Sequence, residues 1–137
     1  LRPPVLDDYG LGPALEWYAQ KFHERTGIGV TVDNDLEDDD LPCETETALF
    51  RIAQESLTNV AKYANATEVT LGIERRNGAL KMRIQDNGRG FDPTAVKPRS
   101  EQNGWGIFSM RERAAAAGAA FHIDSAPGDG TCITVTL

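Results

Sequence analysis

The sequence predicts an α+β domain in which helices cover one face of a mixed sheet. Two strand patterns follow each other directly around residues 77–78, and two more do so around residues 126–130. Three amphipathic helical patterns stand apart from these hairpins. A doubly wound fold would alternate strands and helices throughout, and this chain breaks that alternation twice. Its 137 residues suit one compact domain with a single apolar core.

The first third of the chain predicts one helix and one strand. Residues 1–9 are rich in proline and acidic residues, which is typical of the end of a linker. Residues 11–25 carry apolar side chains at helical spacing, and Gly27 stands where a C-terminal helix cap belongs. Residues 28–32 alternate like a short strand, and the acidic run at 37–40 is typical of a solvated loop.

The rest of the chain predicts two helices and two hairpins. Residues 44–64 form the longest helical pattern, and strands at 68–75 and 79–86 flank Asn77-Gly78, a strong hairpin signal. A helix at 106–117 and strands at 120–125 and 131–137 complete the elements. Between them, the glycine-rich stretch 87–104 is too irregular for an element and long enough to indicate function. The apolar stripe of the longest helix comprises Leu49, Ile52, Ala53, Leu57, Val60 and Ala61.

Composition narrows the function classes. Fourteen basic against 21 acidic residues give a net charge of −7, which disfavours binding to a nucleic-acid backbone. No stretch approaches the roughly 20 apolar residues of a membrane span. Cys43 and Cys132 lie far apart and near no histidine cluster, so we expect free thiols in a reducing cytosol rather than zinc ligands. The chain opens on Leu1, and we therefore expect a piece of a longer protein.

The longest helix carries a polar row that could hold a ligand. Glu55, Asn59 and Lys62 follow at i, i+4 and i+7, so a regular helix would project all three from one side. Such a row is common on solvated helices. Asn59 stands within an otherwise apolar turn, however, and a mid-helix Asn is mildly unfavourable without a partner. Its amide oxygen is a suitable hard ligand for Mg²⁺.

Three further segments could surround a nucleotide. Asp86 ends a strand and is followed by two glycines at alternate positions, which indicates either an ordinary turn or a close approach to a flat ligand. An Asp there could accept a hydrogen bond from the exocyclic amine of adenine. Gly104-Trp105-Gly106 precedes a helix and could present backbone N–H groups to an anion, although this short motif is weak evidence by itself. Thr131 places a hydroxyl at the head of the last strand. Neither a Walker A loop nor a Rossmann fingerprint is present.

Taken in order, these segments resemble the GHKL superfamily of ATP-binding domains, which includes gyrase, heat-shock chaperones, mismatch-repair ATPases and histidine kinases. FRIAQESLTNVAK at 50–62 resembles the N-box, DNGRGF at 86–91 the first glycine box, and GWG at 104–106 the second. Gly130-Thr131 matches the strand-initiating Gly-Thr. LRPPVLDDYGL at 1–11, QESLTN at 54–59 and MRERA at 110–114 resemble sensor histidine kinases that pair with helix-turn-helix response regulators.

The resemblance implies a Bergerat-type fold, a two-layer sandwich of a five-stranded mixed sheet and three helices. Residues 1–10 would be the end of a linker from upstream dimerisation helices, and 11–137 the catalytic domain with a lid at about 93–103. At the phosphate end, Asn59 would coordinate Mg²⁺ and Glu55 would be the acidic group near the γ-phosphate. Lys62 would lean toward the phosphates, and Gly104 and Gly106 would offer them backbone N–H groups.

At the adenine end, the resemblance implies that Asp86 binds the amine of ATP while Gly88 and Gly90 allow the approach. Thr131 would add a hydroxyl nearby. Many relatives have His where this chain has Tyr63, and we expect Tyr63 either to face the nucleotide or to pack against the protein.

The implied function is the ATP-binding half of a two-component sensor kinase. The chain would supply the γ-phosphate of Mg·ATP to a histidine on its own upstream dimerisation domain, and through the full-length kinase to a response regulator. We expect a monomeric, cytoplasmic piece, and a membrane anchor elsewhere in the parent protein is left open. The alternatives are a GHKL ATPase, an anti-sigma-type serine kinase, and a degenerate module that binds a partner without using ATP.

Overall fold

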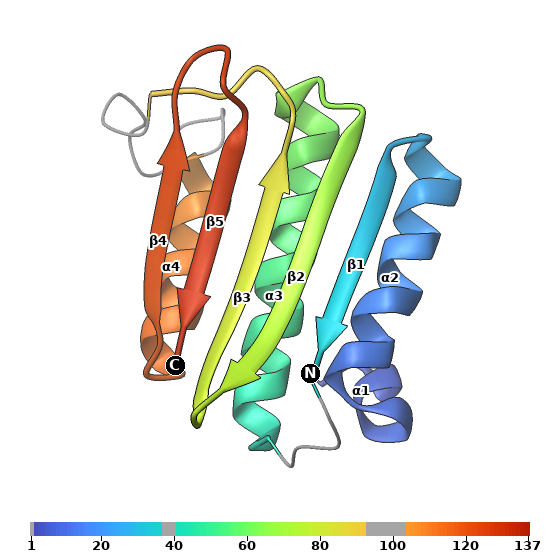
Figure 1. Ribbon diagram of the computed structural model, residues 1–137, viewed down its shortest axis with the longest axis vertical. Coiled ribbons are helices and arrows are strands. Elements are labelled where there is room, and N and C mark those ends of the chain that lie inside the picture. Colours follow the sequence, from blue (N-terminus) through green and yellow to red (C-terminus); the bar gives the residue numbers. More distant parts are fainter. Residues whose placement is uncertain (1, 37–40, 93–103) are drawn as a thin grey trace.

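A five-stranded mixed sheet forms one layer of the molecule (Figure 1). The computed structural model describes residues 2–36, 41–92 and 104–137, so the expected acidic loop at 37–40 and the expected lid at 93–103 lie outside the described residues. The strand order is β1-β2-β3-β5-β4, with β1 parallel to β2 and the other pairs antiparallel. The strands are β1 (Gly29–Asp35), β2 (Glu68–Arg76), β3 (Ala79–Asp86), β4 (Ala120–Ser125) and β5 (Thr131–Thr136).

Three long helices cover one face of the sheet and form the second layer (Figure 1). They are α2 (Leu11–Thr26), α3 (Cys43–Asn59) and α4 (Gly104–Ala116). Side chains along β3 alternate strictly between exposed and buried, because successive residues of a strand point to opposite faces. The expected two-layer α+β fold is therefore confirmed. Among the described residues, no helix is long and apolar enough to cross a membrane.

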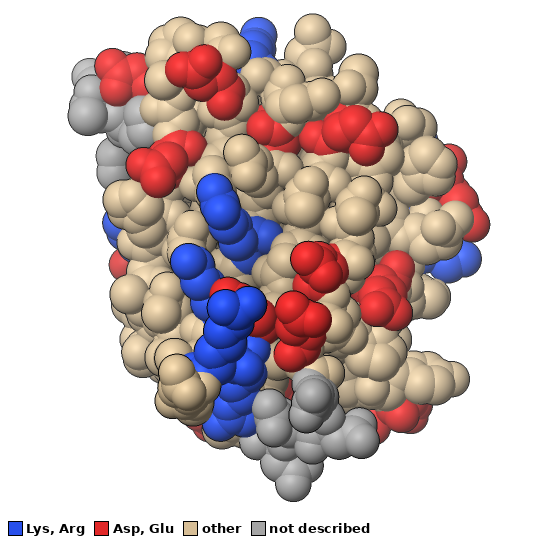
Figure 2. Space-filling model, viewed as in Figure 1, with Lys and Arg blue, Asp and Glu red and all other residues tan. Residues whose placement is uncertain are grey.

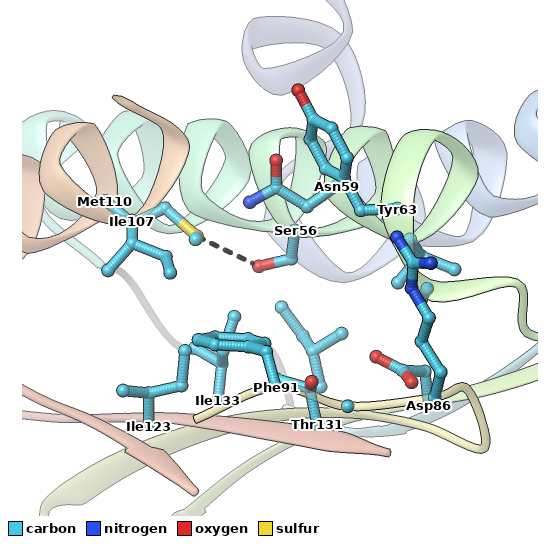
Figure 3. A pocket seen from close by; sticks show the side chains of 15 residues that line it. Ser56, Asn59, Tyr63, Asp86, Phe91, Ile107, Met110, Ile123, Thr131 and Ile133 are labelled. Carbon is cyan, nitrogen blue, oxygen red and sulfur yellow. Dashed lines mark hydrogen bonds between the residues drawn. The ribbon is translucent and has the colours of Figure 1, made fainter. Parts of the chain in front are cut away.

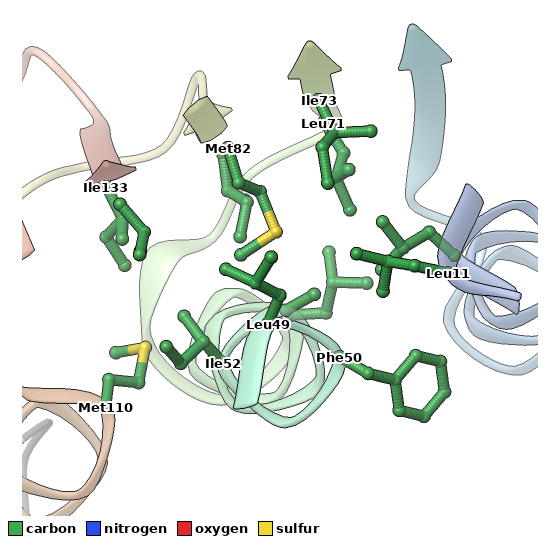
Figure 4. Packing of buried hydrophobic residues seen from close by; sticks show 14 of the residues in the cluster. Leu11, Leu49, Phe50, Ile52, Leu71, Ile73, Met82, Met110 and Ile133 are labelled. Atoms are coloured by element: carbon green, nitrogen blue, oxygen red, sulfur yellow. The ribbon is translucent and has the colours of Figure 1, made fainter. Parts of the chain in front are cut away.

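The core lies between the two layers and is made of apolar side chains from both (Figure 4). Figure 4 shows Leu49 of α3 facing Met82 of β3, and Ile52 of α3 on the side of Met110 of α4. At this interface α3 therefore occupies the centre of the helix layer. The largest fully buried side chains include Phe22, Phe50, Leu15, Leu49, Ile52, Leu57, Leu71, Ile73, Met82 and Met110.

The opening segment, expected to be the end of a linker, packs against the domain. Residues Pro4–Tyr9 form a short helix, α1, with proline in its first turn, and Leu6 is only 2% exposed within the core. The Arg2 guanidinium donates to the backbone oxygen of Cys43 at 2.9 Å and to Glu46 Oε1 at 2.8 Å. These bonds attach the segment to the first turn of α3. The candidate site lies at the other end of that helix.

The opposite face of the sheet carries polar and charged side chains (Figure 2). Lys81 and Arg83 are exposed on β3, and Figure 2 shows basic side chains in the middle of this face with acidic ones beside them. At the end of the β2–β3 hairpin, Asn77 and Gly78 both have positive φ, 53° and 81°, as the predicted turn requires. The sheet is thus buried on its helix side, where a pocket can form between the layers.

Candidate nucleotide site

A cavity of about 290 Å³ opens between the helix layer and the ends of β3 and β5 (Figure 3). Its volume lies just below the usual range of about 300–1,000 Å³ for small-molecule pockets, which suits one part of a nucleotide rather than the whole. Figure 3 shows apolar side chains of α4, β4 and β5 on one side and Tyr63 and Asp86 on the other. The lining residues are Ser56, Asn59, Val60, Tyr63, Ala64, Ile84, Asp86, Arg89, Gly90, Phe91, Ile107, Met110, Ile123, Thr131 and Ile133.

Asp86 is the buried acidic group of this cavity. It is 8% exposed at the end of β3, and the backbone N–H of Gly88 donates to its Oδ1 at 2.8 Å. Burial raises the pKa of the Asp86 carboxyl above its ordinary 3.8, while the backbone N–H groups of Gly88 and Thr131 oppose that rise. A buried carboxylate with two such donors keeps further lone pairs for a ligand. Asp86 is therefore suited to accept a hydrogen bond from an N–H group in the cavity.

Two glycines bring the loop after β3 close to its neighbours. At Gly88 a Cβ would lie 2.3 Å from the backbone oxygen of Ala64, and the next N–H, of Arg89, donates to that oxygen at 2.7 Å. Gly90 has φ +64°, and a Cβ there would lie 2.1 Å from the backbone oxygen of Ala126. Larger residues at these two positions would push the loop away from Ala64 and Ala126.

The expected row of three polar side chains is broken. Helix α3 ends at Asn59 and continues as a π-helical turn, η1 (Val60–Ala64), rather than as a regular α-helix. The wider turn changes the angle between successive side chains, and π turns are frequent at functional sites. Tyr63 lines the cavity, whereas Lys62 is exposed and is not among the lining residues. The π-helical turn thus alters the regular spacing on which the prediction for Lys62 was based.

Glu55 and Asn59 meet the start of α4 at Gly106. A Cβ on Gly106 would lie 2.6 Å from Glu55 Oε1 and 2.7 Å from Asn59 Nδ2, so the helix approaches both side chains closely. The predicted turn at 104–106 is the first turn of α4 itself, which begins at Gly104. The N-terminal end of a helix attracts anions through its free N–H groups and its dipole. The acidic group, the amide and this helix end therefore lie together beside the cavity.

Sequence reasoning assigned no role to three residues that shape the site. Asn87 Oδ1 accepts from the backbone N–H groups of Thr67 at 2.9 Å and Glu68 at 3.1 Å, which ties the loop to β2. Ser125 contacts both the loop and the head of β5. Ser56 is buried in the cavity wall and donates to Met110 Sδ at 3.2 Å. The turn signal at 86–88 marks Asp86, whose carboxylate accepts from the backbone N–H of Gly88, but gives no sign of the distant partners of Asn87 or of the two serines.

Comparison with known proteins shows the family of this chain. Residues 44–137 match the family described as histidine kinase-, DNA gyrase B- and HSP90-like ATPases. The whole chain is 40% identical to the sensor histidine kinase MctS of Rhizobium johnstonii, covering 29% of its length. It is also 38% identical to the signal transduction histidine-protein kinase/phosphatase DegS of Brevibacillus brevis, covering 34% of that protein. The chain thus spans about a third of the length of these curated relatives.

Solved structures show the same fold. The histidine kinase domain of a blue-light activated histidine kinase from Erythrobacter litoralis superimposes over 93% of this chain and 60% of its own, with a TM-score of 0.75 and 24% identity. A mycobacterial sensor histidine kinase, MprB, matches 91% of both chains with a TM-score of 0.67 and 19% identity. At these identities the likeness concerns the fold. With the family match over most of its length, this chain belongs to the histidine kinase-, DNA gyrase B- and HSP90-like ATPases.

Proposed function

We propose that this chain binds Mg·ATP with the adenine base in the cavity beside Asp86. The observation that carries the proposal is a buried carboxylate in a cavity that apolar and polar side chains line together. Adenine has an exocyclic amine where guanine has a carbonyl oxygen, so an acceptor at this position favours ATP over GTP. Glycines at 88 and 90 let the loop after Asp86 lie close to the backbone of Ala64 and Ala126.

The phosphate end would be formed by α3 and the first turn of α4. Asn59 offers an amide oxygen as one ligand of Mg²⁺, which commonly keeps water ligands and uses substrate phosphates as others. Among the described residues, no group of three His, Cys, Asp or Glu side chains could hold a metal alone, so the ion would depend on the nucleotide. When bound, Mg·ATP would supply the phosphoryl group, and Glu55 would orient a nucleophile beside it.

We further propose that the γ-phosphate is transferred to a histidine on a dimerisation domain outside this chain, and from there to a response regulator. Two relatives named above are described as histidine kinases, and both are about three times longer than the matched region. Within the chain, His23 contacts the backbone oxygen of Ile28 at 2.9 Å and His122 is exposed on β4. Neither lines the cavity, so an external acceptor suits the site better than either of them.

Calorimetric titration of Mg·ATP and Mg·GTP tests the proposal directly. We expect wild type to bind ATP and not GTP, Asp86→Asn to lose most of the ATP affinity, and Asn59→Ala to lose its dependence on Mg²⁺. Asp124→Asn is the matched control, because Asp124 is an exposed acid on β4 and is absent from the cavity lining. A wild-type chain that binds no adenine nucleotide, or an Asp124→Asn variant as defective as Asp86→Asn, would contradict the assignment.

A further inference from the structure

Ser125 lies at the end of β4, where its hydroxyl makes three contacts at once. The backbone N–H of Phe91 donates to Ser125 Oγ at 2.9 Å. Ser125 Oγ lies 2.9 Å from the backbone oxygen of Gly130 and 2.9 Å from Thr131 Oγ1. Phe91 and Thr131 both line the cavity, whereas Ser125 is not among the lining residues. Ser125 is therefore placed to act on the site through its neighbours.

The three contacts can all be hydrogen bonds with only one arrangement of the protons. A serine hydroxyl has one proton to donate and two lone pairs to accept with. The Gly130 carbonyl oxygen can only accept, so it takes the Ser125 proton, and the Phe91 N–H can only donate to Ser125. The remaining partner, Thr131, must then donate its own hydroxyl proton to Ser125 Oγ.

This arrangement determines what Thr131 presents to the cavity. With its proton directed to Ser125, Thr131 Oγ1 offers the cavity lone pairs only. Asp86 is the register partner of Thr131 across β3 and β5, and an ionised carboxylate is likewise an acceptor only. Figure 3 shows the side-chain oxygens of both residues on the same side of the cavity. Two neighbouring acceptors thus form one wall.

We propose that Ser125 is a specificity-determining residue, which holds Thr131 as an acceptor and thereby favours a base with an amine over one with a carbonyl oxygen. The inference rests on the proposed binding of adenine in this cavity. In Ser125→Ala, the Thr131 hydroxyl is released and can rotate to donate to a carbonyl oxygen. A bystander serine that only braced the loop would instead change the affinity for both kinds of base equally.

The test measures the ratio of ATP to ITP affinity by calorimetry, because inosine carries a carbonyl oxygen in place of the adenine amine and lacks the additional amine of guanine. The variants are Ser125→Ala, Ser125→Thr, Thr131→Val and the double variant Ser125→Ala/Thr131→Val. We expect the ratio to fall about 3- to 10-fold in Ser125→Ala, the worth of one hydrogen bond, and to be retained in Ser125→Thr. Thr131→Val should lower the ratio similarly, and adding Ser125→Ala to it should change nothing more.

Two results would overturn the inference. One is a Ser125→Ala ratio within about 2-fold of wild type, and the other is an additive loss in the double variant, which would mean that Ser125 acts without Thr131. If Ser125→Ala does not fold, the inference still fails when Thr131→Val leaves the ratio unchanged. Failure of wild type to bind ATP would refute the proposed function, whereas normal ATP binding with an unchanged ratio refutes this inference alone.

Discussion

Replacing Gly106 by alanine should separate stability from nucleotide binding. The added Cβ would lie 2.7 Å from Asn59 Nδ2, and ordinary contact begins at 3.4 Å, so the amide must retreat by about 0.7 Å. Glu55 Oε1, at 2.6 Å, must move by a similar distance. Both atoms are the ends of flexible side chains, and the helix can therefore remain intact. Metal sites tolerate only about 0.2 Å of error, so the affinity for Mg·ATP should fall about 10-fold or more.

The free energy of unfolding of Gly106→Ala should stay close to that of wild type. Alanine is favoured over glycine in a helix by about 0.8–1.0 kcal/mol, and this gain offsets the cost of displacing the two side chains. Calorimetry with and without Mg²⁺, together with thermal unfolding, measures the two effects. Gly72→Ala is the matched control, since a Cβ there meets nothing within 4 Å. The reasoning is refuted if Gly106→Ala binds Mg·ATP like wild type, or if it unfolds well before the control.

Three further outcomes are expected. Because burial raises the pKa of Asp86 above 3.8, the folded chain keeps a proton that the unfolded chain has lost. The free energy of unfolding, relative to that of Asp86→Asn, should therefore fall as pH rises from 3.8 through the raised pKa. Urea unfolding of both proteins between about pH 4 and 7 checks this, and a difference between them that stays constant with pH contradicts it. Arg2→Ala should lower the free energy of unfolding by about 1–2 kcal/mol, because the bonds of Arg2 to Glu46 and to the start of α3 are lost. Its ATP affinity in the calorimetric titration should be unchanged. Gly90→Ala should lower the free energy of unfolding by about 2–3 kcal/mol, because Gly90 has a positive φ and an added Cβ would meet the backbone oxygen of Ala126. Thermal unfolding measures this, and an unchanged melting temperature would contradict the described conformation of the loop.

The sheet and the long helices could be predicted because their sequence patterns are local and repeated. The alternation along 79–86 and the Asn77-Gly78 turn identify the β2–β3 hairpin without tertiary information. Helix α1 was missed because its six residues span less than two turns, too few for a periodic pattern, although Pro4 suits the first turn of a helix. The π-helical turn was missed because residues 60–64 continue the apolar helical pattern unchanged.

The candidate site was predictable where a residue type was unusual for its position. Asn59 in an apolar turn and Asp86 between a strand and two glycines are such cases, and both line the cavity. Ser125 is an ordinary residue at the end of a strand, and its importance arises from three partners at separations of 5, 6 and 34 residues.

By itself, therefore, the sequence determined the five strands, the three long helices and the residue types that could hold a nucleotide, since periodicity and turn chemistry are local properties. Only the tertiary structure decided that Glu55 and Asn59 meet Gly106, that Lys62 is not among the residues lining the cavity, and that Ser125 Oγ lies within hydrogen-bond distance of Thr131. The physical reason is that hydrogen-bond direction and close contact depend on atoms brought together from distant parts of the chain, which no spacing along the chain encodes.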